Sequence, residues 1–168
     1  ERISKRIHEL AARQHSLFHD ILEPQLNAQG IYILKPEQLD ETQRNFVLDY
    51  FDRNLLPLIT PLAVDTGHPF PRLGNRAMVL MAEIDAEDYL EEERLPVSQL
   101  SIIHVPTRVA TRFLRVPSIH GHYSFVILED EVRLHLPRIF HGYTIKNCHA
   151  LRVTRDSDVP MDEDPFED

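Results

Sequence analysis

The sequence is short of the residues on which several protein classes depend. It has one cysteine, Cys148, so no intrachain disulfide can form, and we expect a reducing, cytoplasmic compartment. Its five glycines are scattered, which excludes the glycine-rich phosphate loops of nucleotide-binding folds. No apolar run approaches the roughly 20 residues that a helix needs to span a bilayer, so we predict no transmembrane segment. The apolar fraction of 42% is sufficient for one folded domain of 168 residues.

Acidic charge is concentrated at two places in the chain. The net charge is −9, and residues 156–168 contribute seven acids and no base. A second acidic cluster runs from Glu83 to Glu93. Such surfaces repel phosphate backbones and anionic lipids, so we predict no nucleic-acid partner and interpret both clusters as solvated segments.

A proline-rich apolar stretch, residues 54–71, joins a helical first third to a strand-rich remainder. It contains Pro57, Pro61, Pro69 and Pro71. Proline lacks a backbone donor, fixes φ and pushes the preceding residue toward an extended conformation. The stretch therefore predicts a largely buried, irregular crossover between regular elements.

Two blocks of sequence resemble those of a known family. The first is Ile59-Thr-Pro-Leu-Ala-Val-Asp65 followed by His68-Pro-Phe-Pro71, and the second is His149-Ala-Leu-Arg-Val-Thr-Arg-Asp156. With the order of elements between them, they resemble the head domain of the long, type-one bacterial polyphosphate kinases. The resemblance covers nearly the whole chain.

The resemblance implies an enzyme that reversibly transfers the terminal phosphoryl group of ATP to polyphosphate, with magnesium and through a phosphohistidine. In that family the catalytic groups lie in two C-terminal domains, and nucleotide contacts also come from an N-terminal helical domain. We therefore expect no catalytic, cofactor-binding or metal-ligating residue in this chain, and expect the chain to be inactive by itself. Its expected partners are the other domains of the same polypeptide, which bind ATP and polyphosphate, and further copies in a homo-oligomer.

The resemblance also implies a structural role for the His-Pro-Phe-Pro block. Phe70 is expected to wedge into the core, and His68 to be a hydrogen-bonded structural histidine. Asp65 is near enough in sequence to orient His68, so a catalytic role for this histidine stays as the weaker alternative.

The first third of the chain has the pattern of one long amphipathic helix over residues 2–29. Pro24 should kink or divide this helix, and Gly30 should end it in a left-handed conformation. Its apolar residues alternate at four- and three-residue spacings, with Gln14 in the one gap, which is typical of a stripe that pairs with a partner. The stripe comprises Ile3, Ile7, Leu10, Leu17 and Ile21.

A second helix is predicted to begin after Asp40, because Gln43 three residues later completes a capping pattern. Its predicted buried face comprises Phe46, Val47, Tyr50, Phe51 and Leu55. A third helix is predicted over residues 128–140, with Pro137 limiting its end.

Short apolar runs predict strands at residues 31–34, 77–84, 100–105, 112–116 and 148–154, and residues 123–127 predict either a strand or the entry to the third helix. The run at 77–84 is apolar except for Glu83, which is typical of a central, buried strand. The mixed order predicts an α+β fold, in which the long N-terminal helix and two further helices pack on a small mixed, mostly antiparallel sheet.

Two pairs of histidines are candidate metal ligands. His120 and His122 flank a glycine in a turn, and His15 and His19 lie one helical turn apart beside Asp20. Zinc requires three or four convergent ligands, and neither pair has a third ligand of established spacing. We interpret the first pair as loop residues and the second as part of an exposed helical face.

Cysteine and arginine residues near the C-terminus are the remaining candidates. Cys148 and His149 are adjacent in a predicted strand, so they point to opposite faces, which argues against a nucleophilic pair built from these two alone. Arg152 and Arg155 are suited to bind phosphate, but the seven acids that follow favour an ion pair with the acidic segment.

Both ends of the sequence favour a longer protein. A helical pattern is already running at Glu1, and Asp164-Pro-Phe-Glu167 has the pattern of a helix start. We expect residues 1–29 to link from an N-terminal helical domain, and residues 30–168 to be a C-terminally truncated head domain. Two functions stay open, namely a head domain that scaffolds and dimerises a polyphosphate kinase, and a free-standing interaction module without a catalytic role.

Overall fold

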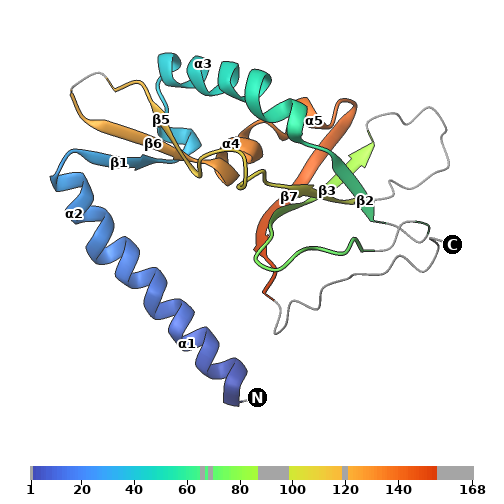
Figure 1. Cartoon of the computed structure of the whole chain (residues 1–168), viewed down its shortest axis with the longest axis horizontal. Helices are drawn as coiled ribbons and strands as arrows, with labels where there is room; N and C mark the ends of the chain where they lie inside the picture. The colour runs from blue at the N-terminus through green and yellow to red at the C-terminus, as the bar shows by residue number, and fades with distance from the viewer. Residues whose placement is uncertain (1, 65–66, 68–69, 87–98, 119–120, 155–168) are drawn as a thin grey trace, which may run out of the picture.

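The chain begins with a long helical run that projects away from the rest of the molecule (Figure 1). The structure is a computed structural model that describes residues 2–64, 67, 70–86, 99–118 and 121–154. The run consists of α1 (Arg2–Ser16), a π-helical turn η1 (Leu17–Leu22) and α2 (Glu23–Ala28). Pro24 lies in the first turn of α2, where its missing donor costs little, and the amide of Glu23 donates to the carbonyl of Phe18 one residue further back than in an α-helix. The predicted helix is therefore confirmed, and Pro24 divides it without ending it.

Gly30 connects the helical run to the first strand. Its φ is 75°, the left-handed conformation that the sequence predicts for this position. A Cβ atom at this residue would lie 2.6 Å from Nδ1 of His122, so no other side chain fits without a shift. The carbonyl of Gly30 accepts a hydrogen bond of 2.8 Å from the amide of Tyr123. Only Gln29 and Gly30 therefore separate helix α2 from strand β1, and Gly30 packs closely against His122.

A small three-stranded sheet follows this joint. Its order is β1-β6-β5, with β1 parallel to β6 and β5 antiparallel to it. The strands are β1 (Ile31–Leu34), β5 (Phe113–Val116) and β6 (Tyr123–Ile127). The short 3-10 turn η2 (Pro36–Gln38) leads from β1 to α3 (Glu41–Tyr50), which packs on this sheet through Val47 against Leu114 and Val126.

The predicted cap of α3 is present. The Asp40 carboxylate accepts a hydrogen bond of 2.8 Å from the amide of Gln43, and the Gln43 side chain accepts one of 3.2 Å from the amide of Asp40. This reciprocal pair satisfies two backbone donors at the helix start. The amide nitrogen of the Gln43 side chain also donates to the carbonyl of Pro117, at 2.8 Å, which ties the helix start to the end of β5.

A four-stranded antiparallel sheet forms the other half of the molecule. Its order is β2-β4-β3-β7, so β3 is central, as its near-continuous apolar sequence predicts. The strands are β2 (Pro61–Val64), β3 (Met78–Ala86), β4 (Gln99–His104) and β7 (Tyr143–Arg152).

The largest core lies between one face of this sheet and three helical segments. These are η3 (Phe51–Leu55), a π-helical continuation of α3, together with α4 (Leu128–Leu134) and α5 (Leu136–Ile139). The α3–η3 run therefore packs on both sheets, because Val47 belongs to the smaller core and Phe51 to the larger one. The larger core also contains Leu55, Leu80, Ile103, Leu128 and Val132, none with any exposed surface.

The α+β class is confirmed, but the predicted single sheet is two sheets. The sequence pattern predicts that residues 113–116 are extended, but it does not predict which strands they pair with, and so it does not predict the number of sheets. The predicted third helix is also divided, because Pro137 lacks the amide that would bond back to Arg133, and α4 ends before α5 begins. Among the described residues, no helix is long and apolar enough to cross a membrane.

The proline-rich crossover differs most from its prediction. It contains the 3-10 turn η4 (Leu56–Leu58) and the strand β2, and of its described residues only Leu55 and Ile59 are buried. Pro61 begins an edge strand, the one strand context that tolerates a missing donor. Phe70 is 53% exposed, so the predicted core wedge is wrong. Phe46 is likewise 39% exposed, because it lies off the helical row that carries Val47, Phe51 and Leu55 into the cores.

Candidate functional site

The histidine candidates lie on separate elements. The rings of His15 and His19 are 4.3 Å apart, and Nδ1 of His19 lies 2.8 Å from a carboxylate oxygen of Glu23, one helical turn further on. The His122 ring meets Tyr32 edge to face at 5.4 Å, while His120 lies outside the described residues. Within the part of the chain that the structure describes, no three histidine, cysteine or acidic side chains are placed to hold a metal ion. That this chain binds no metal stays a prediction.

Cys148 and His149 point to opposite faces of β7, as their adjacency predicts. Cys148 is in register with Ala82 and packs against the larger core, whereas His149 is in register with Met81 and is exposed. Burial raises the pKa of the Cys148 thiol above its usual value, which keeps it protonated and unreactive at neutral pH. These two residues do not form a nucleophilic pair.

The other candidates are placed only in part. Arg152 is exposed at the end of β7, in register with Met78. Asp65, His68 and Arg155, and the acidic segment beyond it, lie outside the described residues. The ion pair between the arginines and the acidic segment, and the structural role of His68, therefore stay predictions.

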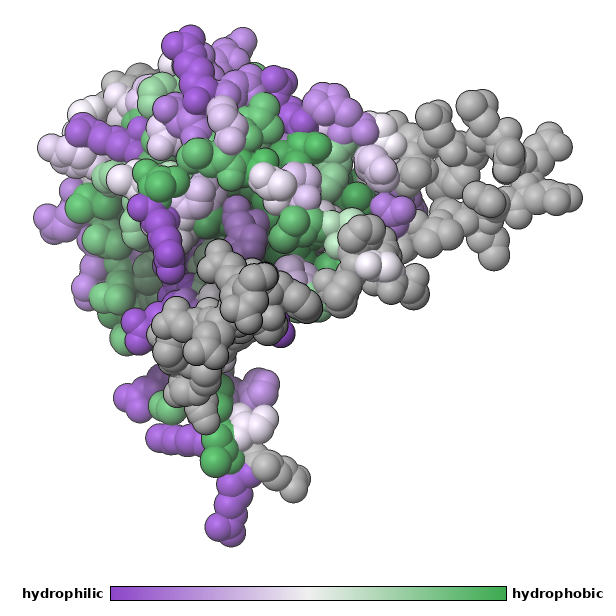
Figure 2. Space-filling view, turned by 45° about the vertical axis from the view of Figure 1, so that its right-hand side comes forward, coloured by the Kyte–Doolittle hydropathy of each residue, from purple (hydrophilic) through white to green (hydrophobic). Residues whose placement is uncertain are grey.

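The apolar stripe of α1 and η1 is exposed along its whole length. No residue of α1 or η1 is buried, and the side chain of Ile3 is 77% exposed. Figure 2 shows apolar side chains on this helix beside hydrophilic ones, well away from the body of the molecule. The other stripe residues, Ile7, Leu10, Leu17 and Ile21, are each between 48% and 59% exposed. A helix that buries nothing against its own domain gains little stability from tertiary packing, so this stripe is a candidate assembly surface.

Charge along the same helical run is asymmetric. The α1 segment has four basic residues and one acid, Glu9, whereas η1 and α2 have Asp20 and Glu23 and no lysine or arginine. The net charge, counted without histidine, is thus +3 in the first half and −2 in the second. A partner helix that packs along the stripe would therefore lie in a positive electrostatic potential at one end and a negative one at the other.

A run of three buried acids at the start of α4 is a feature that the sequence analysis missed. Glu129 is 5% exposed and accepts from Nε of Arg112 at 3.1 Å, and Asp130 is 5% exposed and accepts from Arg133 at 3.1 Å. Glu131 has no exposed surface, and neither of its carboxylate oxygens has a hydrogen-bond partner. An uninterrupted Glu-Asp-Glu run gives no sequence signal of burial, because acids are usually exposed.

The environment of Glu131 perturbs its own protonation and that of its neighbours. Burial raises the pKa of Glu131 to about 8, so its neutral form predominates at pH 7. The pKa of Tyr50 is also raised, first by burial and then by the charge of Glu131. Burial lowers the pKa of His135, whose Nδ1 lies 3.0 Å from the Glu131 carbonyl. Glu131 lies between Leu128 and Val132 of the larger core, so its ionisation bears on the stability of the fold.

Comparisons with known proteins agree with one another. A family model described as the polyphosphate kinase middle domain matches residues 42–168. The chain is 35% identical over 160 residues to a polyphosphate kinase of Neisseria meningitidis serogroup B, covering 94% of this chain and 23% of that protein. It is 34% identical over 166 residues to a polyphosphate kinase of Halalkalibacterium halodurans, covering 99% of this chain and 23% of that protein.

A solved structure has the same fold. The crystal structure of a polyphosphate kinase from Porphyromonas gingivalis superimposes with a TM-score of 0.80 at 23% sequence identity, over 96% of this chain and 25% of that one. The chain thus spans about a quarter of the length of these relatives.

Proposed function

This chain belongs to the polyphosphate kinase family, and we propose that it serves there as the head domain, which holds subunits together and takes no part in phosphoryl transfer. In this proposal the whole enzyme is cytoplasmic and uses ATP and magnesium to extend polyphosphate through a phosphohistidine. The reacting groups belong to other domains of the polypeptide. The match to a middle domain, over about a quarter of the relatives' length, supports that division of labour.

The exposed stripe on the projecting helix is the observation that carries the proposal. Its spacing of four and three residues is the pattern by which two helices pack side by side. The helical run Arg2–Ala28 would extend about 40 Å at 1.5 Å per residue, which is long enough for an extensive contact. We assign a second copy of this chain as the occupant of the stripe.

Charge complementarity favours an antiparallel arrangement of the two copies. In that arrangement the basic half of one helix, with Lys5 and Arg6, lies against the acidic half of the other, with Asp20 and Glu23. A parallel arrangement would place like charges together and would be less favourable. The contact is self-complementary, as a two-fold symmetric dimer requires.

Sedimentation velocity across a concentration series tests this assembly. We expect the chain to associate to a dimer, and we expect Leu10→Glu combined with Leu17→Glu to convert it to a monomer, because each substitution buries a charge in the stripe. The fold of the domain should be unchanged, since both side chains are exposed and no residue of α1 or η1 is buried.

The matched control adds the same two acids to the opposite side of the helix, as Ala12→Glu with Ser16→Glu. This control should leave the dimer intact. A parent chain that is monomeric at every concentration would refute a second copy as the occupant and would favour the N-terminal helical domain in its place. A dimer that survives the stripe substitutions would place the interface elsewhere on the domain.

A free-standing interaction module is the other function that the long helix permits. The genomic reading frame separates the two, because a head domain is followed by catalytic domains in the same frame. A stop codon close to Asp168 would support the free-standing module.

A further inference from the structure

One end of the four-stranded sheet holds a pocket that belongs neither to the helical stripe nor to the buried acids. It has a volume of about 380 Å³ and is lined by two five-residue segments, 74–78 and 104–108. The first leads into β3 and the second follows β4, and the amide of Val105 donates to the carbonyl of Met78 at 3.0 Å. Met78 and Val105 are buried. Strand pairing therefore assembles the pocket from segments about thirty residues apart.

The lining of this pocket is cationic, although the chain as a whole is acidic. It includes Arg76, Arg108 and His104, and none of its ten residues is an aspartate or glutamate. All three of these side chains are exposed, and within the described part of the chain none makes a hydrogen bond or an ion pair. Arg152 adds a third guanidinium at the same end, because its register partner is Met78 of the pocket.

Arg76 occupies a backbone position that is costly for arginine. The amide of Ala77 donates to the carbonyl of Gly74, which closes a turn with Arg76 at its third position and a φ of 59°. Glycine or asparagine is the usual residue there, because a side chain with positive φ is strained. The amide of Arg76 also donates to the carbonyl of Val153 at 2.7 Å, which fixes the turn against the extension of β7. A strained residue that carries an unpaired guanidinium is typical of a ligand site.

We propose that this pocket, at the β3–β4 end of the larger sheet, binds an inorganic chain of linked phosphates. Guanidinium groups bind phosphate oxygens through paired, charge-assisted hydrogen bonds, and Thr107 adds a hydroxyl donor to the lining. Among the residues that the structure describes, the lining contains no phenylalanine, tyrosine or tryptophan on which a nucleobase would stack, so this chemistry favours an inorganic chain over a nucleotide. The proposal depends on this pocket alone and not on dimerisation through α1. An experiment that contradicts phosphate binding would therefore leave the dimer proposal untouched, and the reverse also holds.

Isothermal titration calorimetry of the chain with tripolyphosphate, at low and at physiological ionic strength, is the test. We expect saturable one-to-one binding that weakens with salt. Arg76→Gly and Arg108→Gln should each weaken binding about tenfold, because each removes a charge-assisted hydrogen-bonding group. Glycine suits the positive φ at residue 76, so Arg76→Gly should fold at least as stably as the parent, which separates lost binding from lost structure.

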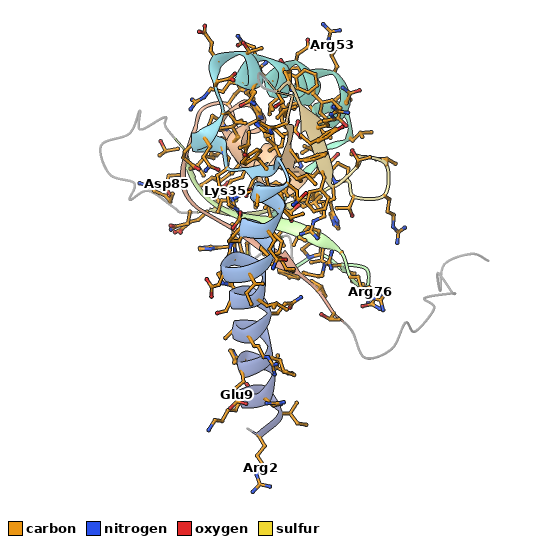
Figure 3. The ribbon with its side chains drawn as sticks, turned by 90° about the vertical axis from the view of Figure 1, so that its left-hand side faces the viewer. Arg2, Glu9, Lys35, Arg53, Arg76 and Asp85 are labelled. Atoms are coloured by element: carbon orange, nitrogen blue, oxygen red, sulfur yellow. The ribbon has the colours of Figure 1, made fainter. Side chains whose placement is uncertain are left out.

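The matched control is Arg53→Gln, which removes the same charge at a distant place. Arg53 and Arg76 lie at well-separated parts of the domain in Figure 3, and Arg53 forms an exposed ion pair with Asp49 at 2.7 Å. This control should leave the affinity for tripolyphosphate unchanged. Equal weakening by all three variants, or no saturable binding by the parent, would overturn the proposal.

Two further titrations identify the occupant. ATP should bind more weakly than tripolyphosphate, and tighter binding of ATP would overturn the assignment of an inorganic chain. Binding that appears only after deletion of residues 156–168 would show that the acidic segment is the occupant, which would also overturn the proposal.

Discussion

Removing the charge of Glu131 should stabilise the protein, and the gain should depend on pH. The perturbation is Glu131→Gln, which keeps the size and shape of the side chain and removes its ionisation. Glu131 has no exposed surface and no hydrogen-bond partner for either carboxylate oxygen, so its ionised form is uncompensated in the core. Substitution of a buried acid usually breaks a hydrogen bond or ion pair, whereas the carboxylate of Glu131 makes neither within the described part of the chain.

The magnitude follows from the pKa of the folded and unfolded states. Burial raises the folded pKa of Glu131 to about 8 from the ordinary value of 4.5. Below pH 4.5 the carboxyl is neutral in both states and costs nothing. Between the two pKa values the unfolded state ionises and the folded state does not, so stability falls as pH rises, until it levels off above pH 8. At about 1.4 kcal/mol for each pKa unit, the loss is about 3 kcal/mol at pH 7 and about 5 kcal/mol above pH 8.

Urea unfolding of the parent and the variant at a series of pH values between 4 and 9 measures this effect. Glu131→Gln should match the parent at the acidic end and exceed it by about 3 kcal/mol at pH 7. The same substitution at Glu129 is the control, because Glu129 is almost as buried but is paired with Arg112. Glu129→Gln should lose about 1–2 kcal/mol at neutral pH. A difference between Glu131→Gln and the parent that is the same at pH 5 and pH 8 would refute the reasoning.

Two further predictions concern the core and the absence of catalysis. Phe51→Ala should destabilise by about 3–5 kcal/mol, because Phe51 has no exposed surface and stacks on His135 at 4.5 Å, whereas Phe70→Ala should cost less than about 1 kcal/mol. Thermal melts of the two variants would contradict this if their order were reversed. Incubation of the chain with γ-labelled ATP and magnesium should leave no phosphohistidine, because we place the reacting groups in other domains. Stable label on any of its histidines would show that this placement is wrong.

Local features of the fold were predictable from the sequence because their causes are local. The capping pair of Asp40 and Gln43 satisfies donors within one turn, and the left-handed Gly30 ends a helix that its own side-chain spacing predicts. The central position of β3 follows from the apolar run of residues 78–82 at its start, since a strand covered on both faces needs no polar side. The family resemblance added what local patterns do not supply, namely the enzyme to which the domain belongs.

Features that depend on long-range pairing were not predictable. The division into two sheets depends on which strands pair with each other. The sequence of β5 is compatible with a place in either sheet. The family resemblance implies that Phe70 wedges into the core, yet its side chain is 53% exposed, because burial depends on how the crossover packs and not on the local motif. The burial of Glu131 was also not predictable, because nothing in the neighbouring sequence distinguishes a buried acid from an exposed one. Arg76 and Arg108 become neighbours only when β3 pairs with β4.

The short joint of Gln29 and Gly30 makes the projecting helix a lever. Over a length of about 40 Å, a rotation of about 5° at the joint displaces the far end near Arg2 by about 3–4 Å. That displacement is comparable to the spacing between neighbouring side chains, so a small angular change at residue 30 suffices to shift which residues meet a partner helix. The close packing of Gly30 against His122 therefore influences the direction in which the helix, and with it the apolar stripe, projects from the domain. In the proposed dimer, the relative alignment of the two helices would therefore depend on the body of the domain as well as on the stripe.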